Sequence, residues 1–251
     1  MRYIALRLAY SGTNYHGWQA QKELPTVSGT LERALSEICG EQVRVTGCGR
    51  TDAGVHAKTY VANFRTGSQL PVDRLPYAVN SRLPEDIAVY DAAEVEEDFH
   101  AVFSAVKKEY TYYIYPSRLK NPFYARRAYF YPGKIDLEAM RSAAAQMTGT
   151  HDFSAFRSAG SNVKTTVRTV YYFDCAAEGE LIALKICANG FLYNMARSMA
   201  GTAIYASEGK ILPERIPDIF DAAQRKNAGP TLPPHGLFMT GVWYKTPVFK
   251  R

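Results

Sequence analysis

Residues 47–57 read Gly47-Cys48-Gly49-Arg50-Thr51-Asp52-Ala53-Gly54-Val55-His56-Ala57. The three glycines of this stretch allow backbone turns that a β-carbon forbids, and they allow a ligand to approach the chain closely. The stretch lies between two segments, 42–46 and 59–65, in which apolar residues alternate as they do in strands. The sequence therefore predicts a glycine-rich loop between two strands, around which the rest of the fold is organised.

This loop carries one acid, Asp52, and one permanent cation, Arg50. Catalytic carboxylates are often found on such loops, because a loop exposes the side chain while the strands beside it fix its position. A carboxylate in this place can equally serve as a turn residue that accepts hydrogen bonds from its own loop backbone. The residue types alone leave both roles open.

Strand and helix patterns alternate on either side of this loop. The patterns predict strands over residues 2–10, 42–46, 59–65 and 87–90, and helices over residues 27–39 and 75–83. Thr26 or Ser28 can cap the first helix and Gly40 ends it, whereas Pro76 is expected to disrupt a turn of the second. The resulting order, β-α-β-β-α-β, is that of a ferredoxin-like fold.

The second half of the chain repeats this order. It predicts strands over residues 108–115, 167–173, 181–187 and 237–244, and helices over residues 137–147 and 191–207, with an extra helix over 213–225. The join near residues 103–106 is short. We therefore expect an α+β protein with two tandem ferredoxin-like halves, residues 1–104 and 105–251, a central mixed or antiparallel sheet, and a cleft between the halves.

The composition favours an anionic partner. The net charge is +6 and the sequence pI is about 9.0, which points to nucleic acid before membrane. The four cysteines lack metal-ligand spacing, the first residues form a strand pattern rather than a signal segment, and no run approaches the ~20 apolar residues of a membrane span. These features predict a cytoplasmic protein with free thiols.

A basic and aromatic segment lies between Lys107 and Lys134. It holds seven lysines and arginines, seven tyrosines and a single acid, Glu109. Cations neutralise phosphates and aromatic faces stack on unpaired bases, so this mixture is typical of single-stranded RNA recognition. The alternative is an exposed basic strand and loop whose tyrosines belong partly to the core, since strand side chains alternate between faces.

The loop from Gly49 to Ala57 resembles the signature loop of the bacterial tRNA pseudouridine synthase A family. Further segments resemble the motifs of that family in the same order, namely residues 11–21, 99–105 with 108–112, 151–156 with 165–168, 190–197 and 235–237. In the first of them, Tyr15 and Trp18 can also simply pack back on the core. The resemblance covers nearly all 251 residues and implies the pseudouridine synthase fold.

The family resemblance implies an isomerase that converts uridine to pseudouridine at nucleotides 38 to 40 of the tRNA anticodon arm, acting as a homodimer with a basic cleft. Asp52 is then the catalytic nucleophile, Tyr110 stacks on the target base, and Arg197 takes the place of the arginine that pairs with the catalytic acid. Leu237 packs beside the active site, and Arg50 is expected to bind substrate. The reaction is neutral in redox and mass, so it requires no cofactor or metal.

Three positions depart from the family pattern: Val102 replaces a usual arginine, Ser28 a glutamine and Ala196 a valine. Val102 removes one expected RNA or base-positioning contact, which leaves open a changed set of target uridines. Because Asp52, Tyr110 and Arg197 are intact, we expect catalysis to be retained.

Two rival functions deserve comparison. A glycoside or nucleoside hydrolase could use Asp52, but such enzymes usually employ two carboxylates and the loop offers one. A non-catalytic RNA-binding module would not need the three intact family residues. The five histidines lack HxH or HxxxH spacing and are expected to be structural or RNA-contacting rather than metal ligands, at positions 16, 56, 100, 151 and 235.

Overall fold

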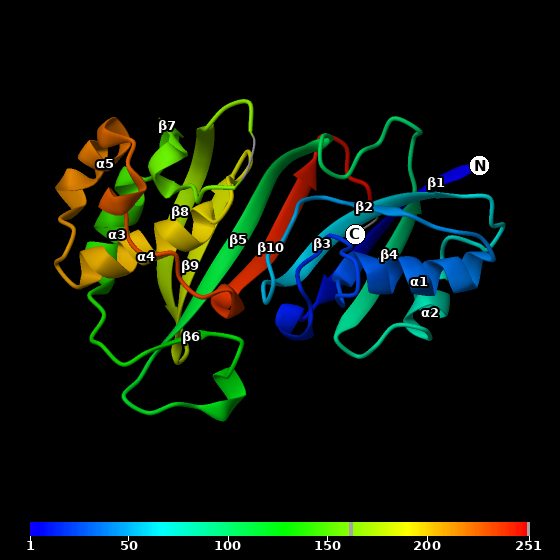
Figure 1. Cartoon of the computed structure of the whole chain (residues 1–251), viewed down its shortest axis with the longest axis horizontal. Coiled ribbons are helices and arrows are strands. Elements are labelled where there is room, and N and C mark those ends of the chain that lie inside the picture. The colour runs from blue at the N-terminus through cyan, green and yellow to red at the C-terminus, as the bar shows by residue number, and fades with distance from the viewer. Residues whose placement is uncertain (161–162, 250–251) are drawn as a thin grey trace. The chain divides into compact units, whose positions relative to one another are not determined.

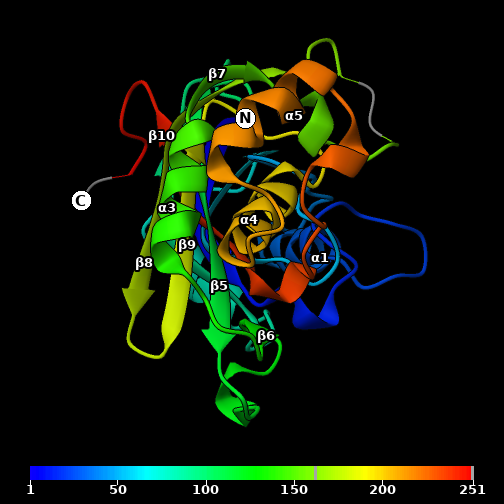
Figure 2. The same ribbon diagram turned by 90° about the vertical axis from the view of Figure 1, so that its left-hand side faces the viewer.

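The computed structural model describes residues 1–160 and 163–249 (Figures 1 and 2). The chain divides into two compact units, Met1–Lys107 with Phe238–Arg251, and Lys108–Leu237. This division differs from the predicted halves, because the last segment of the chain belongs to the first unit. Its strand pairs there in parallel, Phe238 opposite His56 and Met239 opposite Ala57, and such a long-range pairing leaves no local sequence signal.

The first unit contains an antiparallel sheet in the order β4-β1-β3, with β2 beside β3 and helices on one face (Figure 1). Its elements follow the predicted order β-α-β-β-α-β, and the strand order is the ferredoxin-like one. They are β1 (Arg2–Tyr10), α1 (Val27–Cys39), β2 (Val45–Gly47), β3 (His56–Thr66), α2 (Leu75–Asn80), β4 (Ile87–Glu94) and most of β10 (Leu237–Tyr244).

The second unit contains a sheet in the order β5-β9-β8-β7, with β6 parallel to β5. Its helix α3 packs against α4 and against β8. The elements are β5 (Ala105–Pro116, its first residues in the first unit), β6 (Tyr129–Tyr131), α3 (Leu137–Gln146), β7 (Gly149–Asp152), β8 (Val167–Glu178), β9 (Leu181–Ala188), α4 (Met195–Ser207) and α5 (Ile216–Ala222). Parallel and antiparallel pairs occur together, so the protein is α+β with mixed sheet pairing, as predicted.

Six short 3₁₀ helices complete the described elements. They are η1 (Gly12–Asn14), η2 (Pro122–Tyr124), η3 (Phe153–Phe156), η4 (Pro213–Arg215), η5 (Arg225–Asn227) and η6 (Pro234–Gly236). None was predicted as a 3₁₀ helix, because a single turn carries too little hydrophobic periodicity to be recognised. Within the described residues, no helix is both long and apolar enough to cross a membrane.

Backbone conformation explains where the helix predictions fail. Helix α4 begins at Met195 rather than at 191, because Asn194 adopts a left-handed conformation with φ of 63°. Helix α5 ends at Ala222, because Ala223 is left-handed with φ of 51°. Pro76 does not disrupt α2, since it occupies the first turn, where its missing N–H is not needed.

Candidate active-site residues

Asp52 lies on the loop between β2 and β3, in the first unit, and the residue before it is held firmly. Thr51 is buried; its carbonyl accepts a hydrogen bond from the Trp18 N–H at 3.1 Å. Its Oγ1 lies 2.8 Å from the Tyr10 hydroxyl. The backbone that leads into Asp52 is therefore fixed to residues near the end of β1 and in the loop that follows it.

Glycines allow this neighbouring loop to press against the Asp52 loop. Gly17 has φ of +88°, and a β-carbon there would lie 2.5 Å from the Thr51 oxygen. A β-carbon on Gly12 would lie 2.0 Å from the Val55 oxygen. These separations are far below van der Waals contact, so only glycine fits at either position. The first family motif thus contributes a backbone clamp on both sides of Asp52.

A buried aromatic layer supports the turn before Asp52. The rings of Trp18 and Tyr60 lie 4.2 Å apart, and the Tyr60 hydroxyl donates to the Gly49 carbonyl. Trp18 is 5% exposed, so it packs on the core as the alternative interpretation of its loop predicted. This packing explains why Gly47 is required, because a β-carbon there would lie 2.2 Å from the Tyr60 hydroxyl.

Within this clamped loop Asp52 is half-buried and Arg50 is exposed. His56 follows at the start of β3 and is buried; its Nδ1 accepts the Gly12 N–H at 3.1 Å, and its ring stacks on Phe238 at 4.4 Å. His56 therefore has a structural role, which is one of the two roles, structural or RNA-contacting, that the sequence predicts for the histidines. Among the residues that the structure describes, no group of three or more His, Cys, Asp or Glu side chains could hold a metal ion.

Tyr110 lies on β5 in the second unit, opposite Ile186 of β9. The Tyr110 ring packs edge-to-face against the Phe191 ring, with ring centroids 4.9 Å apart and an interplanar angle of 80°. Only 8% of Tyr110 is exposed. A base that stacks on this ring must therefore displace neighbouring atoms.

Arg197 stands in the first turn of α4, also in the second unit. Its Nε donates to the Leu232 carbonyl at 2.6 Å and its Nη1 to Asn194 Oδ1 at 2.7 Å. Asn194 is itself held, since its Nδ2 donates to Ser158 Oγ at 2.9 Å. The left-handed Asn194 that shortens the helix thus also orients the guanidinium.

Leu237 is 6% exposed and directly follows η6. The Tyr112 hydroxyl donates to the Pro233 carbonyl at 2.8 Å, and a β-carbon on Gly236 would lie 2.7 Å from Tyr112 Cζ. Burial raises the pKa of Tyr112 above its usual range. Burial, reinforced by the charges of Arg126 and Arg197, lowers the pKa of His235 in η6.

The predicted site residues therefore form two groups. Asp52 and Arg50 share one loop of the first unit. In the second unit, η6 packs on β5 through Tyr112, two residues from Tyr110, and Arg197 binds the segment that leads to Leu237.

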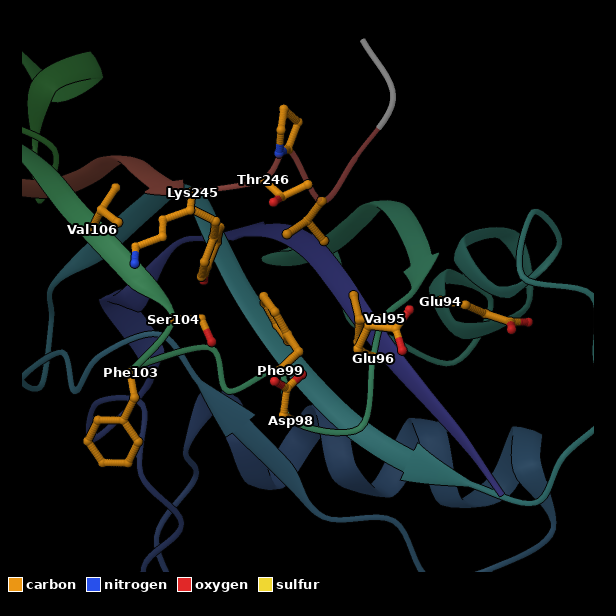
Figure 3. Close-up of a pocket in the computed structure, with 13 residues that line it drawn as sticks. Glu94, Val95, Glu96, Asp98, Phe99, Phe103, Ser104, Val106, Lys245 and Thr246 are labelled. Atoms are coloured by element: carbon orange, nitrogen blue, oxygen red, sulfur yellow. The ribbon is translucent and has the colours of Figure 1, made fainter.

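The sequence did not predict a cavity of about 540 Å³ beside the second family motif, in the first unit (Figure 3). Phe99, Phe103 and Ser104 of the motif line it together with Tyr244 and three acids, Glu94, Glu96 and Asp98. The motif turn is tied to His100, whose Nδ1 accepts the N–H groups of Val102 at 3.2 Å and Phe103 at 3.4 Å. Only the run of acids over residues 94–98 could have drawn attention to it.

The basic segment 107–134 is as exposed as predicted for its cations but not for its tyrosines. Its arginines and the lysines beyond β5 are exposed, whereas each of the seven tyrosines is buried or half-buried. The one strongly exposed aromatic residue of this segment is Phe123, at 85%. The alternating positions on β5 account for the burial of several tyrosines, as the alternative interpretation of this segment predicts, and the tyrosine pattern carries no signal for the exposed phenylalanine.

Comparison with known proteins identifies the class. A family model described as tRNA pseudouridine synthase matches residues 8–104 and 143–245, so the chain belongs to this family of isomerases. More narrowly, its relatives confirm the resemblance to the tRNA pseudouridine synthase A family. The protein of that name from Acetivibrio thermocellus is 46% identical over 244 residues, 97% of this chain and 100% of that protein. That from Caldicellulosiruptor bescii has the same identity and coverage.

Among solved structures, a Cbf5–Nop10–Gar1 complex is similar with a TM-score of 0.40 and 12% identity, over 94% of this chain and 57% of that chain. A similarity this slight carries no argument about the site.

Proposed function

We propose that this enzyme isomerises uridines at nucleotides 38 to 40 of the tRNA anticodon arm, with Asp52 as the nucleophile. The observation that carries the proposal is the clamped loop. A nucleophile must be held within a few tenths of an ångström of its productive position. Thr51 before Asp52 and Val55 after it are both pressed against glycines of a neighbouring loop, which provides that rigidity.

The reaction needs nothing beyond the uridine. The N1–C1′ bond breaks, the uracil turns, a C5–C1′ bond forms, C5 loses its proton and N1 gains one. A carboxylate near the sugar-base junction can start this sequence by attack on C1′, by addition to C6 of the base, or by removal of a sugar proton. Each of these routes requires Asp52 to be ionised and close to the nucleoside.

Tyr110 and Arg197 are assigned to substrate binding. Flipping a base out of its stack costs a few kcal/mol, and stacking on an aromatic ring offsets part of this cost. Tyr110 offers such a ring on a rigid strand. The guanidinium of Arg197, fixed by Leu232 and Asn194, presents a permanent charge with defined orientation. Arg50 and Leu237 complete the proposed set.

The relatives are named for action on tRNA, and the exposed cations beyond β5 suit an RNA backbone. We extend that substrate to this chain, together with a cytoplasmic location and the homodimer that the family resemblance implies. Light scattering of the purified protein measures the dimer directly: a monomer mass would contradict this part of the proposal alone.

The test of the function is tritium release from 5-tritiated uridine in whole tRNA, followed by mapping of the modified nucleotides. Isomerisation releases the C5 tritium and leaves pseudouridine at positions 38 to 40. A nucleoside hydrolase instead produces free uracil, and a binding module produces neither. Tritium release with modification at other positions would retain the chemistry and overturn the proposed target.

A further inference from the structure

The loop of residues 117–128, between β5 and β6, is unusual in its surface. Phe123 is 85% exposed and Leu119 is 78% exposed. Around them stand four exposed cations, and the loop contains no acid; the cations are Arg118, Lys120, Arg126 and Arg127. Single exposed apolar side chains are common on protein surfaces, but here two of them stand among cations in one loop, and the charges indicate an anionic partner.

The loop is nevertheless well ordered by its own contacts. Asn121 caps η2, with its Oδ1 accepting the Phe123 N–H at 3.0 Å. The Tyr124 carbonyl accepts the Ala128 N–H at 3.0 Å. Arg126 has φ of 57°, a left-handed conformation that a non-glycine residue adopts only when its surroundings hold it there. A turn held in this way presents Phe123 in a defined position.

A second set of contacts anchors this turn to the sheet. The ring of Tyr124 lies 4.9 Å from that of Tyr115 on β5, and its hydroxyl donates to Glu180 at 3.0 Å in the turn between β8 and β9. In both views the loop extends beyond the end of the β8–β9 hairpin (Figures 1 and 2). Phe123 therefore stands on a supported projection of the second unit.

We infer that Phe123 stacks on an unpaired base of the bound tRNA, and that this base is not the target uridine. The inference rests on the proposed function and deepens it. An aromatic face among cations is the combination that binds single-stranded RNA, in which stacking on the base accompanies contacts to phosphates. A second copy of this surface is a poorer partner, because a two-fold contact would oppose like charges.

The geometry of β5 separates the two stacking positions. Tyr115, which contacts the base of the projection, follows Tyr110 by five residues on the same strand. At ~3.3 Å per residue these two positions lie about 17 Å apart. Phe123 is the chain neighbour of Tyr124, whose ring packs on Tyr115, so Phe123 stands at the Tyr115 position of the strand and not at the Tyr110 position. We therefore assign it a second unpaired nucleotide of the same molecule.

The first experiment measures tRNA affinity across a salt series for Phe123→Ala, Phe123→Trp and wild type. Loss of the stacking face should weaken binding about tenfold without a change in the salt slope, because no phosphate contact is lost, and tryptophan should restore the affinity. Tyr77→Ala is the matched control, since Tyr77 is 75% exposed on α2 of the first unit and should bind as wild type does. Wild-type affinity for Phe123→Ala, or an equal loss for Tyr77→Ala, overturns the inference.

The second experiment places p-benzoylphenylalanine at position 123 and irradiates the complex with tRNA. The expected product is a crosslink to an unpaired nucleotide outside the modified position. A crosslink only between two protein chains, or a changed oligomeric state of Phe123→Ala, assigns the surface to a second copy and overturns the inference. Tritium release by the wild-type enzyme is measured alongside: its absence defeats the proposed function, whereas its presence with an unaffected Phe123→Ala defeats only this inference.

Discussion

Two loops of this molecule are built in opposite ways. The loop around Asp52 is enclosed: Thr51 is 7% exposed and Val55 is 2% exposed, and glycines press against it. The loop around Phe123 projects, with its apolar and charged side chains in solvent. Both are ordered, but one is ordered by packing from outside and the other by its own turns and by contacts such as that of Tyr124 with Glu180.

The difference corresponds to the two tasks of an enzyme that modifies RNA. A reacting carboxylate must not move, because an error of about 1 Å can cost a hundredfold in rate. A surface that binds a large flexible partner must be accessible, and it acts through added contacts rather than exact position. Substitutions in the first loop should therefore lower the rate, and those in the second should lower affinity.

The largest effect among the structural substitutions is expected for Gly17→Ala. The added β-carbon would lie 2.5 Å from the Thr51 oxygen, on a residue with φ of +88°, so residues 51 to 53 must shift. The rate of tritium release at saturating tRNA should fall about a hundredfold. Circular dichroism on heating shows whether the fold persists.

Gly67→Ala is the control for this substitution. A β-carbon at Gly67 has ordinary contacts, the nearest being Glu41 Oε2 at 3.6 Å, so this variant should keep wild-type activity. A folded Gly17→Ala protein with a rate near wild type would show that the clamp does not position Asp52.

A smaller effect is expected at Tyr110. Tyr110→Phe keeps the aromatic face and most of the tRNA affinity, whereas Tyr110→Ala weakens engagement of the flipped base by about 1–3 kcal/mol. The ratio of kcat/KM values for the two variants measures this. Complete inactivity of the phenylalanine variant with normal binding would show that the hydroxyl takes part in catalysis, and normal behaviour of both would remove Tyr110 from the site.

The smallest effect concerns charge in the projecting loop. Replacing both Arg126 and Arg127 with glutamate should weaken the binding of cognate and non-cognate tRNAs alike. The slope of log affinity against log salt concentration should become shallower by about one to two units, since each phosphate contact contributes ~0.7 to 0.9. The loss should fall on affinity rather than on the rate at saturating tRNA, since backbone contacts read no bases. An unaltered salt slope would mean that these arginines are only solvated.

Local signals explain what the sequence predicts well. Helix α1 spans Val27–Cys39 as expected, because its signals are all local. Thr26 caps its start, Leu31 and Leu35 recur at helical spacing, and Gly40 ends it. The wrong start predicted for α4 is also local: Leu192 fits the helical period, but Asn194 is left-handed, so the helix begins at Met195. No periodicity reports such a conformation.

Long-range geometry explains what the sequence does not predict. The parallel pairing of Phe238 with His56 joins the two chain segments of the first unit, and the contact of Gly17 with Thr51 joins two motifs that the family pattern treats separately. The family resemblance located Asp52 but gave no reason for the glycines near it. The structure supplies the reason as a packing requirement on residues 12, 17 and 47.

The measurement that tests the central claim most directly is the single-turnover rate of tritium release by Asp52→Asn at saturating tRNA, with its tRNA affinity determined in parallel. The amide keeps the shape of the carboxylate but cannot act as a nucleophile or base. We expect no detectable turnover and an affinity within about tenfold of wild type, because the substitution leaves the loop and the side chains proposed to bind tRNA intact. Turnover near the wild-type rate would contradict the assignment of Asp52, whatever the other variants show.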